Sequence, residues 1–423
     1  MHRKSSGRKN RPPQCMGEDT TRPSATPQAR DRLREVLPPV LFLTLIFFLH
    51  FLGRQLLGPM LPAMERDLRI SHAVSGLFIL VMGAGFFLSQ LVAAFVTARF
   101  GYRICIVLSL WGAAASMAGV GLVGSLWALF LGFFLLGVTG GLYAPSGIAL
   151  ISVLVHPRDW GKAMGIHELA PNLALIVAPF FATMVLGVAS WRWGFLSLSG
   201  FLAVTGAVYA RHGVDAEARG SIPDIHRVRE IAGNPAFWGL VGLLSIAVGV
   251  ETGVYAVVPL FLVNERGFDL AEANRILGLS RIPGLAVVLL SGWITDRLSP
   301  RTTLRLALGA TGVTIIVLGL GPRSVSIPSI FAQAAAAACL FPPILSAASG
   351  ISTPENRALT ISLSLAVAPV LGGGLVPAGI AFAGDLGSFG LGLAGAGVLV
   401  LFGVMLVRSL ERGKANLFSP GIL

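Results

Sequence analysis

Residues 169–187 read LAPNLALIVAPFFATMVLG and residues 367–385 read VAPVLGGGLVPAGIAFAGD, and the second stretch repeats the first. Pro171 and Pro179 each find a matching proline 198 residues later in the chain. Each stretch is largely apolar and about 20 residues long, which is the length a helix needs to cross a bilayer. The pair therefore predicts two copies of one helical unit embedded in a membrane.

Other parts of the chain repeat at nearly the same displacement and in the same order. Residues 142–145 (LYAP) match residues 340–343 (LFPP) at 198 residues. The further matches are Arg99 with Arg297 and Arg103 with Arg301 at 198 residues, and Pro59, Glu65 and Arg66 with Pro259, Glu265 and Arg266 at 200 residues. One such match would have little weight, but a collinear series predicts a duplicated chain.

The composition excludes a water-soluble fold. Of the 423 residues, 54% are hydrophobic and 12% are charged, and the mean hydropathy is +0.77. A soluble domain carries about a quarter charged residues and could not bury so much apolar surface. The apolar runs are continuous, which disfavours the alternating strands of a β-barrel. Helices remain as the way to satisfy backbone hydrogen bonds in lipid.

Hydropathy divides the chain into twelve expected spans, near residues 38–60, 73–97, 103–122, 126–154, 162–187, 191–211, 236–262, 271–295, 303–321, 326–350, 357–382 and 387–409. We predict an all-α polytopic membrane protein whose twelve transmembrane helices form two pseudo-symmetric six-helix bundles. The expected domains are a disordered basic cytoplasmic tail (1–36), an N-terminal bundle (37–211), a cytoplasmic linker (212–235), a C-terminal bundle (236–411) and a cytoplasmic tail (412–423).

The net charge of +12 follows the pattern of a topology signal. Nine of the 32 Lys and Arg residues lie in the first 34 positions, and most others lie in short segments between apolar runs. Positive charge is retained on the cytoplasmic side, so both termini are predicted to be cytoplasmic in a cell inner membrane. This distribution also argues against nucleic acid as a partner.

A loop between two spans of the second copy carries a recognisable motif. Residues 292–301 read GWITDRLSPR, with Asp296 and Arg297 four and five positions after Gly292, and Arg301 at the end. In this motif the chain resembles the major facilitator superfamily, and the resemblance extends from about residue 36 to 411. It implies the twelve-helix fold of that family and a cytoplasmic latch formed by Gly292, Asp296, Arg297 and Arg301.

The first copy of the latch departs from the family pattern. Arg99, Gly101 and Arg103 are present, but Ala94 and Ala98 stand where the family has glycine and aspartate. We therefore expect a weaker latch in this half.

Two motifs typical of drug–proton antiporters in the family are poorly matched. Phe133 stands where their fourth span carries an arginine, and Ala178-Pro179 replaces a Gly-Pro pair in the fifth. These departures weaken a drug–proton antiporter interpretation.

Few ionisable residues lie within the expected spans, and each needs a partner or a purpose because a charge in the bilayer is costly. Arg54 has no acidic residue at its depth in its own half, and His50 lies one turn away on the same face. A guanidinium can bind a carboxylate or phosphate through two parallel hydrogen bonds, so we predict Arg54 as an anion ligand. The alternative is that Arg54 extends to the outer headgroups.

Glu251 and Arg281 lie at similar depth on consecutive spans of the second copy. They could form a structural ion pair. They could instead form a switch in which protonation of Glu251 releases Arg281 to bind substrate.

His167 and Glu168 begin the fifth span, where they are either interfacial or capping residues or take part in proton coupling. Neutral hydrogen bonds to a substrate could come from Tyr143, Asn172, Tyr255 and Gln333.

Together these features predict a secondary transporter that works by alternating access, with its site between the two halves. The favoured substrate is a small organic anion, with proton coupling through Glu251. We expect no enzymatic activity, cofactor or metal, a monomeric state, and the lipid bilayer and a small molecule as partners. The alternatives are an exporter of amphipathic drugs or metabolites, and a non-transporting membrane sensor.

Overall fold

The structure is a computed structural model that describes residues 33–214, 224–348, 351–352 and 356–417. The first helices are α1 (Leu33–Gln55), α2 (Leu57–Leu68), α3 (His72–Leu122), α4 (Leu126–Leu154), α5 (Trp160–His167), α6 (Leu169–Leu186) and α7 (Trp191–His212), and α8 (Ile225–Gly233) follows. The later helices are α9 (Pro235–Val248), η1 (Gly249–Gly253), α10 (Val254–Asn264), α11 (Leu270–Leu298), α12 (Pro300–Leu320), α13 (Arg323–Ala338), α14 (Phe341–Ala348), α15 (Arg357–Val370), η2 (Leu371–Leu375), α16 (Val376–Asp385) and α17 (Phe389–Leu417).

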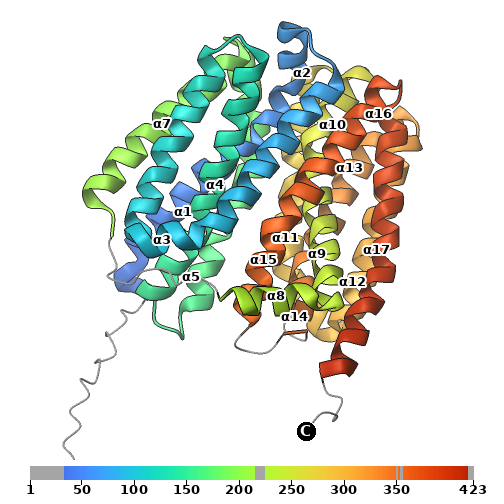
Figure 1. The fold of residues 1–423 in the computed structure, drawn as a ribbon. Coiled ribbons are helices and arrows are strands. Elements are labelled where there is room, and N and C mark those ends of the chain that lie inside the picture. Colours follow the sequence, from blue (N-terminus) through green and yellow to red (C-terminus); the bar gives the residue numbers. More distant parts are fainter. Residues whose placement is uncertain (1–32, 215–223, 349–350, 353–355, 418–423) are drawn as a thin grey trace, which may run out of the picture.

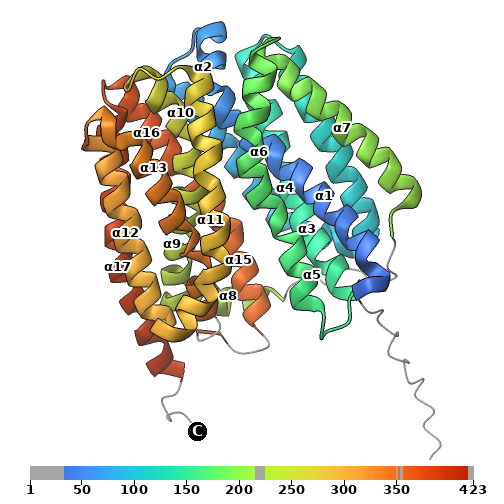
Figure 2. The same cartoon turned by 180° about the vertical axis from the view of Figure 1, so that it is seen from behind.

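These helices form two groups that stand side by side (Figures 1 and 2). We call α1 to α7 the first half and α9 to α17 the second half. The short helix α8 lies between them at one end of the molecule, near α5 and α14, and α2 lies at the opposite end (Figure 1). We refer to these two ends as the α8 end and the α2 end.

The helices account for all twelve expected spans. Ten helical stretches of the described residues are long and apolar enough to cross a membrane. One of them, α3, contains two expected spans joined at Gly101, whose φ of 79° and ψ of 167° are not helical and suit glycine. The helix α11, of 29 residues, covers the expected span at 271–295. The prediction of an all-α polytopic fold is therefore confirmed.

The outer surface of both halves is apolar. Large side chains that are exposed there include Phe95, Trp111, Val204, Val313 and Phe402. Such a surface would be unstable in water but is what lipid chains solvate. The largest buried side chains, among them Trp191, Tyr143 and Tyr255, fill the space between helices instead.

Several spans are interrupted close to prolines. Proline lacks an amide hydrogen and clashes with the carbonyl four residues earlier. Pro171 is four residues after His167, where α5 ends, and Pro343 is four residues after Cys339, where α13 is capped. In the second half the backbone widens into two π-helices, η1 and η2, which pack against one another.

The two halves are joined by hydrogen bonds near the α2 end. The carboxylate of Asp385, the last residue of α16, accepts hydrogen bonds of 2.9 Å from the backbone amides of His72 and Ala73 at the start of α3. The side chain of Asn274 in α11 donates to the carbonyl of Pro59 in α2 at 3.3 Å. Negative charge at a helix N-terminus is favourable, so Asp385 fastens one half to the other.

Candidate functional site

Arg54 of α1 lies between two aromatic rings. Its guanidinium carbon is 4.9 Å from the ring centre of Phe51 and 4.9 Å from that of Phe86. Phe51 is three residues earlier on the same helical face, whereas Phe86 comes from α3. The negative faces of the rings favour the cation but leave its N–H groups without acceptors.

The hydrogen-bonding capacity of Arg54 is unused within the described residues. Its Nε is buried without a partner, and it takes part in no hydrogen bond or ion pair there. Gly140 of α4 makes room for the side chain, because a Cβ at that position would lie 3.4 Å from both Cδ and Nε of Arg54. The sequence pattern did not indicate Phe86 or Gly140, since both reach Arg54 from other helices.

Arg281 of α11 has a similar environment in the second half. The residue is 8% exposed, and its guanidinium carbon lies 4.9 Å from the ring centre of Tyr255 in α10. Its Nε also has no hydrogen-bond partner. The charges of Glu251 and Arg281 act on one another. Across the described part of the chain, however, no ion pair within 4.0 Å joins the two side chains.

Glu251 lies in the middle of the π-helix η1, a feature that the sequence analysis did not anticipate. Backbone contact with η2 holds this helix: a Cβ on Gly249 would lie 3.2 Å from the Cα of Gly372, and one on Gly253 would lie 2.9 Å from the carbonyl oxygen of Gly372. The glycines on either side of Glu251 and the run at 372–374 were the available signal. Single-turn π-helices are frequent at functional sites.

Four aromatic and histidine rings stack on one another in the first half. His50 stacks on Tyr143 with ring centres 5.2 Å apart, and Phe47 stacks on His167 at 4.5 Å with an interplanar angle of 9°. The hydroxyl of Tyr143 contacts the carbonyl of Leu43 at 2.6 Å and Nε2 of His167 at 3.2 Å. Nε2 of His50 bonds to the hydroxyl of Ser109 at 3.2 Å.

Glu168 occupies the break between α5 and α6. Its side chain is 53% exposed, and Oε1 lies 3.8 Å from Nδ1 of His167, which is itself fully buried. Although Glu168 and Glu251 belong to different halves, the charge of one acts on the other.

Most of the predicted neutral ligands donate hydrogen bonds to backbone carbonyls. Asn172 donates to the carbonyl of Glu168 at 3.0 Å, Tyr255 to that of Leu175 at 3.0 Å and Gln333 to that of Val250 at 2.8 Å. The bond from Tyr255 crosses between the halves, and the bond from Gln333 reaches η1. These three side chains therefore position the elements around the site.

The predicted latch is only partly described. Gly292 and the side chain of Asp296 lie outside the described residues, while Arg297 and Arg301 flank the junction of α11 and α12. In the first half, Arg99 precedes the turn at Gly101, and Nη2 of Arg103 donates to the carbonyl of Ala210 in α7 at 2.9 Å.

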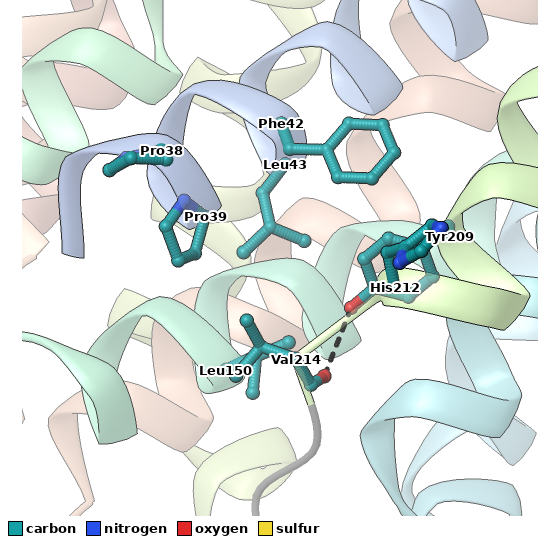
Figure 3. A pocket seen from close by; sticks show the side chains of 8 residues that line it. All are labelled: Pro38, Pro39, Phe42, Leu43, Leu150, Tyr209, His212 and Val214. Atoms are coloured by element: carbon teal, nitrogen blue, oxygen red, sulfur yellow. Dashed lines mark hydrogen bonds between the residues drawn. The ribbon is translucent and has the colours of Figure 1, made fainter.

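A separate pocket of about 190 Å³ lies on the flank of the first half (Figure 3). Its lining residues are Pro38, Pro39, Phe42, Leu43, Leu150, Tyr209, His212 and Val214. The Tyr209 hydroxyl donates to the carbonyl of Val214 at 3.5 Å. None of the predicted site residues lines this pocket, and its lining is mainly apolar, so we do not assign the site to it.

Comparisons with known proteins identify similar chains. The sequence model of the Major Facilitator Superfamily matches residues 43–332. The probable sulfoacetate transporter SauU of Cupriavidus necator is 25% identical over 387 residues, with 86% of each chain covered. The probable nitrate/nitrite transporter NarK2 of Mycobacterium tuberculosis is 23% identical over 299 residues, which is 66% of this chain and 71% of that protein.

A solved structure has the same fold. A bacterial homologue of the human lysosomal transporter Spinster, in an inward-facing and occupied conformation, superposes with a TM-score of 0.72 and 19% identity. The match covers 91% of this chain and 96% of that one.

Proposed function

The chain belongs to the major facilitator superfamily of secondary transporters, and we propose that the solute it moves is a small organic anion bound by Arg54 and Arg281. It is a multi-pass membrane protein and not an enzyme. In this family the solute site is exposed alternately to the two sides of the membrane.

One observation carries the substrate class: each half contributes an arginine, Arg54 or Arg281, that has a buried Nε without a partner and makes no hydrogen bond within the described residues. Burying an arginine without a hydrogen-bonding acceptor is costly. Such an arginine is therefore expected where a bound ligand supplies the missing acceptor. A carboxylate or sulfonate accepts two parallel N–H groups from a guanidinium. The names of two relatives, a sulfoacetate and a nitrate/nitrite transporter, share the chemistry of a small oxoanion.

We propose that the protein lies in the inner membrane of the cell and that its α8 end faces the cytoplasm. The positive charge of the chain's polar segments supports this orientation. The bonds of Asp385 to His72 and Ala73 would then close the opposite side. In this conformation the site would exchange solute with the cytoplasm, and transport would require these bonds to break.

The substrate class is tested by counterflow in proteoliposomes that contain the full chain. Sulfoacetate, tartrate, nitrate and the cationic dye ethidium serve as probes, each preloaded and then offered as labelled tracer. We expect exchange of at least one of the organic anions and none of ethidium. Exchange of ethidium alone would replace the proposal with the drug-exporter alternative.

Glu251→Gln should uncouple the transporter. The charge of Glu251 acts on Arg281 although no ion pair within 4.0 Å joins them, so the charge state of Glu251 would set how strongly it competes with an anion for that guanidinium. A permanently neutral amide removes this competition. We expect counterflow of the anion to continue, while accumulation driven by a pH gradient falls to the level without a gradient.

Glu230→Gln provides the control, because Glu230 is an exposed carboxylate of α8 in the linker between the halves. It should leave gradient-driven accumulation at the wild-type level. Full accumulation in Glu251→Gln would remove Glu251 from the coupling mechanism.

A further inference from the structure

The hydrogen bonds of Tyr143 fix which nitrogen of His167 carries a hydrogen. A carbonyl oxygen can only accept, so the Tyr143 hydroxyl donates its single hydrogen to the carbonyl of Leu43, 2.6 Å away. Towards Nε2 of His167, at 3.2 Å, the tyrosine oxygen is then the acceptor. Nε2 must therefore be the protonated nitrogen of this ring.

The other nitrogen of His167 is consequently an acceptor in the neutral ring. Nδ1 is buried without a hydrogen-bond partner, and Oε1 of Glu168 lies 3.8 Å away. A bare nitrogen lone pair beside a carboxylate is unfavourable. One proton removes this repulsion. It is held either by Nδ1, as an imidazolium beside the carboxylate, or by Glu168, as a carboxylic acid that donates to Nδ1.

We propose that His167 and Glu168 together hold one exchangeable proton, and that this pair is the proton-binding site of the first half. The inference rests on the proposed function for its role in transport. The exposed carboxylate of Glu168 takes the proton from water and passes it to Nδ1 of His167. When the proton leaves by the same route, the pair changes from neutral to a net charge of −1.

The position of the pair links this charge to the rest of the site. The fully buried ring of His167 is held by Phe47 on one face, while Glu168 occupies the break between α5 and α6. Although Glu168 and Glu251 belong to different halves, the charge of Glu168 acts on Glu251. Proton loss therefore adds negative charge where an anion must pass, and by linkage the bound anion favours the protonated pair.

Two neighbouring titratable groups, Tyr143 and His50, have hydrogen-bond partners of their own. Tyr143 in α4 donates to the carbonyl of Leu43, and His50 of α1 stacks on Tyr143 and is hydrogen-bonded to Ser109. At the start of α5, Lys162 bonds to Asp159 at 2.9 Å and lowers the pKa of that carboxyl. In the second half, Glu251 is the group whose charge interacts with that of Glu168.

The test measures the proton on His167 directly. The full chain is labelled with ¹⁵N-histidine, placed in liposomes and followed by solid-state NMR between about pH 5 and pH 9. His167→Gln identifies the resonance. We expect Nε2 to keep its hydrogen throughout, whereas the Nδ1 resonance moves as the shared proton is lost. In Glu168→Gln the amide donates to Nδ1 permanently, so the Nδ1 resonance should no longer depend on pH.

Asp159→Asn is the matched control, since it removes a carboxylate beside the same helix and should leave the titration intact. A wild-type Nδ1 resonance that does not change over this range would overturn the proposal. So would a titration that persists unchanged in Glu168→Gln, or a hydrogen found on Nδ1 in place of Nε2.

A transport measurement separates this inference from the proposed function. With sulfoacetate and tartrate as probes, Glu168→Gln should retain counterflow and lose at least about tenfold of the stimulation by a pH gradient. Full stimulation in this variant would refute the role of the pair while leaving the anion assignment in place. If the wild type moves neither probe, the anion assignment fails on these probes, and the NMR titration still decides whether the pair holds a proton.

Discussion

Arg54→Gln should lower the rate of anion counterflow at least about a hundredfold, because it removes the guanidinium expected to bind the substrate in the first half. Losing a buried, charge-assisted pair typically costs about 2–5 kcal/mol, and about 3 kcal/mol corresponds to that factor. Arg54→Lys keeps the charge but loses the parallel N–H groups, so we expect intermediate activity. The measurement is initial-rate counterflow at several anion concentrations.

Stability distinguishes a binding role from a structural one. Arg54 makes no hydrogen bond within the described residues, so Arg54→Gln should leave the thermal unfolding temperature close to that of the wild type. Arg266 offers the contrast: it stacks on Phe261 and donates to the carbonyls of Leu318 and Gly319. Arg266→Gln should destabilise the protein while keeping its apparent affinity for the anion. Normal transport with Arg54→Gln would show that Arg54 is not a ligand.

Hydropathy and the internal repeat were sufficient to predict the twelve spans, because both are properties of the local sequence. They were not sufficient to predict how the backbone departs from a regular α-helix in each of two equivalent spans. The matched prolines gave a turn at Glu168 in the first half and the π-helix η2 in the second. The difference follows from residues 372–374: three glycines allow a wider helix and close backbone contact, whereas the first copy has Ala174, Leu175 and Ile176 at the corresponding distance after Pro171.

The candidate site was predicted as residues but not as an arrangement. Arg54, Glu251 and Arg281 were identified because buried charge is rare and costly in a membrane. The enclosure of Arg54 by Phe86 and Gly140 depends on the crossing of three helices, which no spacing within one helix encodes. The same holds for His167, whose protonated nitrogen is set by a tyrosine in α4 and a carbonyl in α1.

Gly372→Ala should strongly impair both stability and transport, because it forces η2 away from the last turn of α9 and the start of η1. A Cβ at this position would lie 1.9 Å from the carbonyl oxygen of Ser245 and 2.7 Å from the amide nitrogen of Gly249. Both are backbone atoms, so no side-chain rotation relieves the clash. Overpacking of this kind costs about 1–3 kcal/mol and sometimes more. We expect a clearly lowered unfolding temperature and less than about a tenth of wild-type counterflow.

The neighbouring glycine provides a control with the same substitution in the same π-helix. A Cβ on Gly373 would meet only side-chain atoms, Cγ1 of Val248 at 3.4 Å and Oγ1 of Thr252 at 3.5 Å, which is ordinary contact. Gly373→Ala should therefore remain stable and active. Because Gly249 lies two residues before Glu251, the separation of η1 from η2 moves that carboxylate relative to Arg281. If Gly372→Ala behaved like Gly373→Ala, the close backbone contact could not be what positions Glu251, and the coupling proposed for it would need another structural basis.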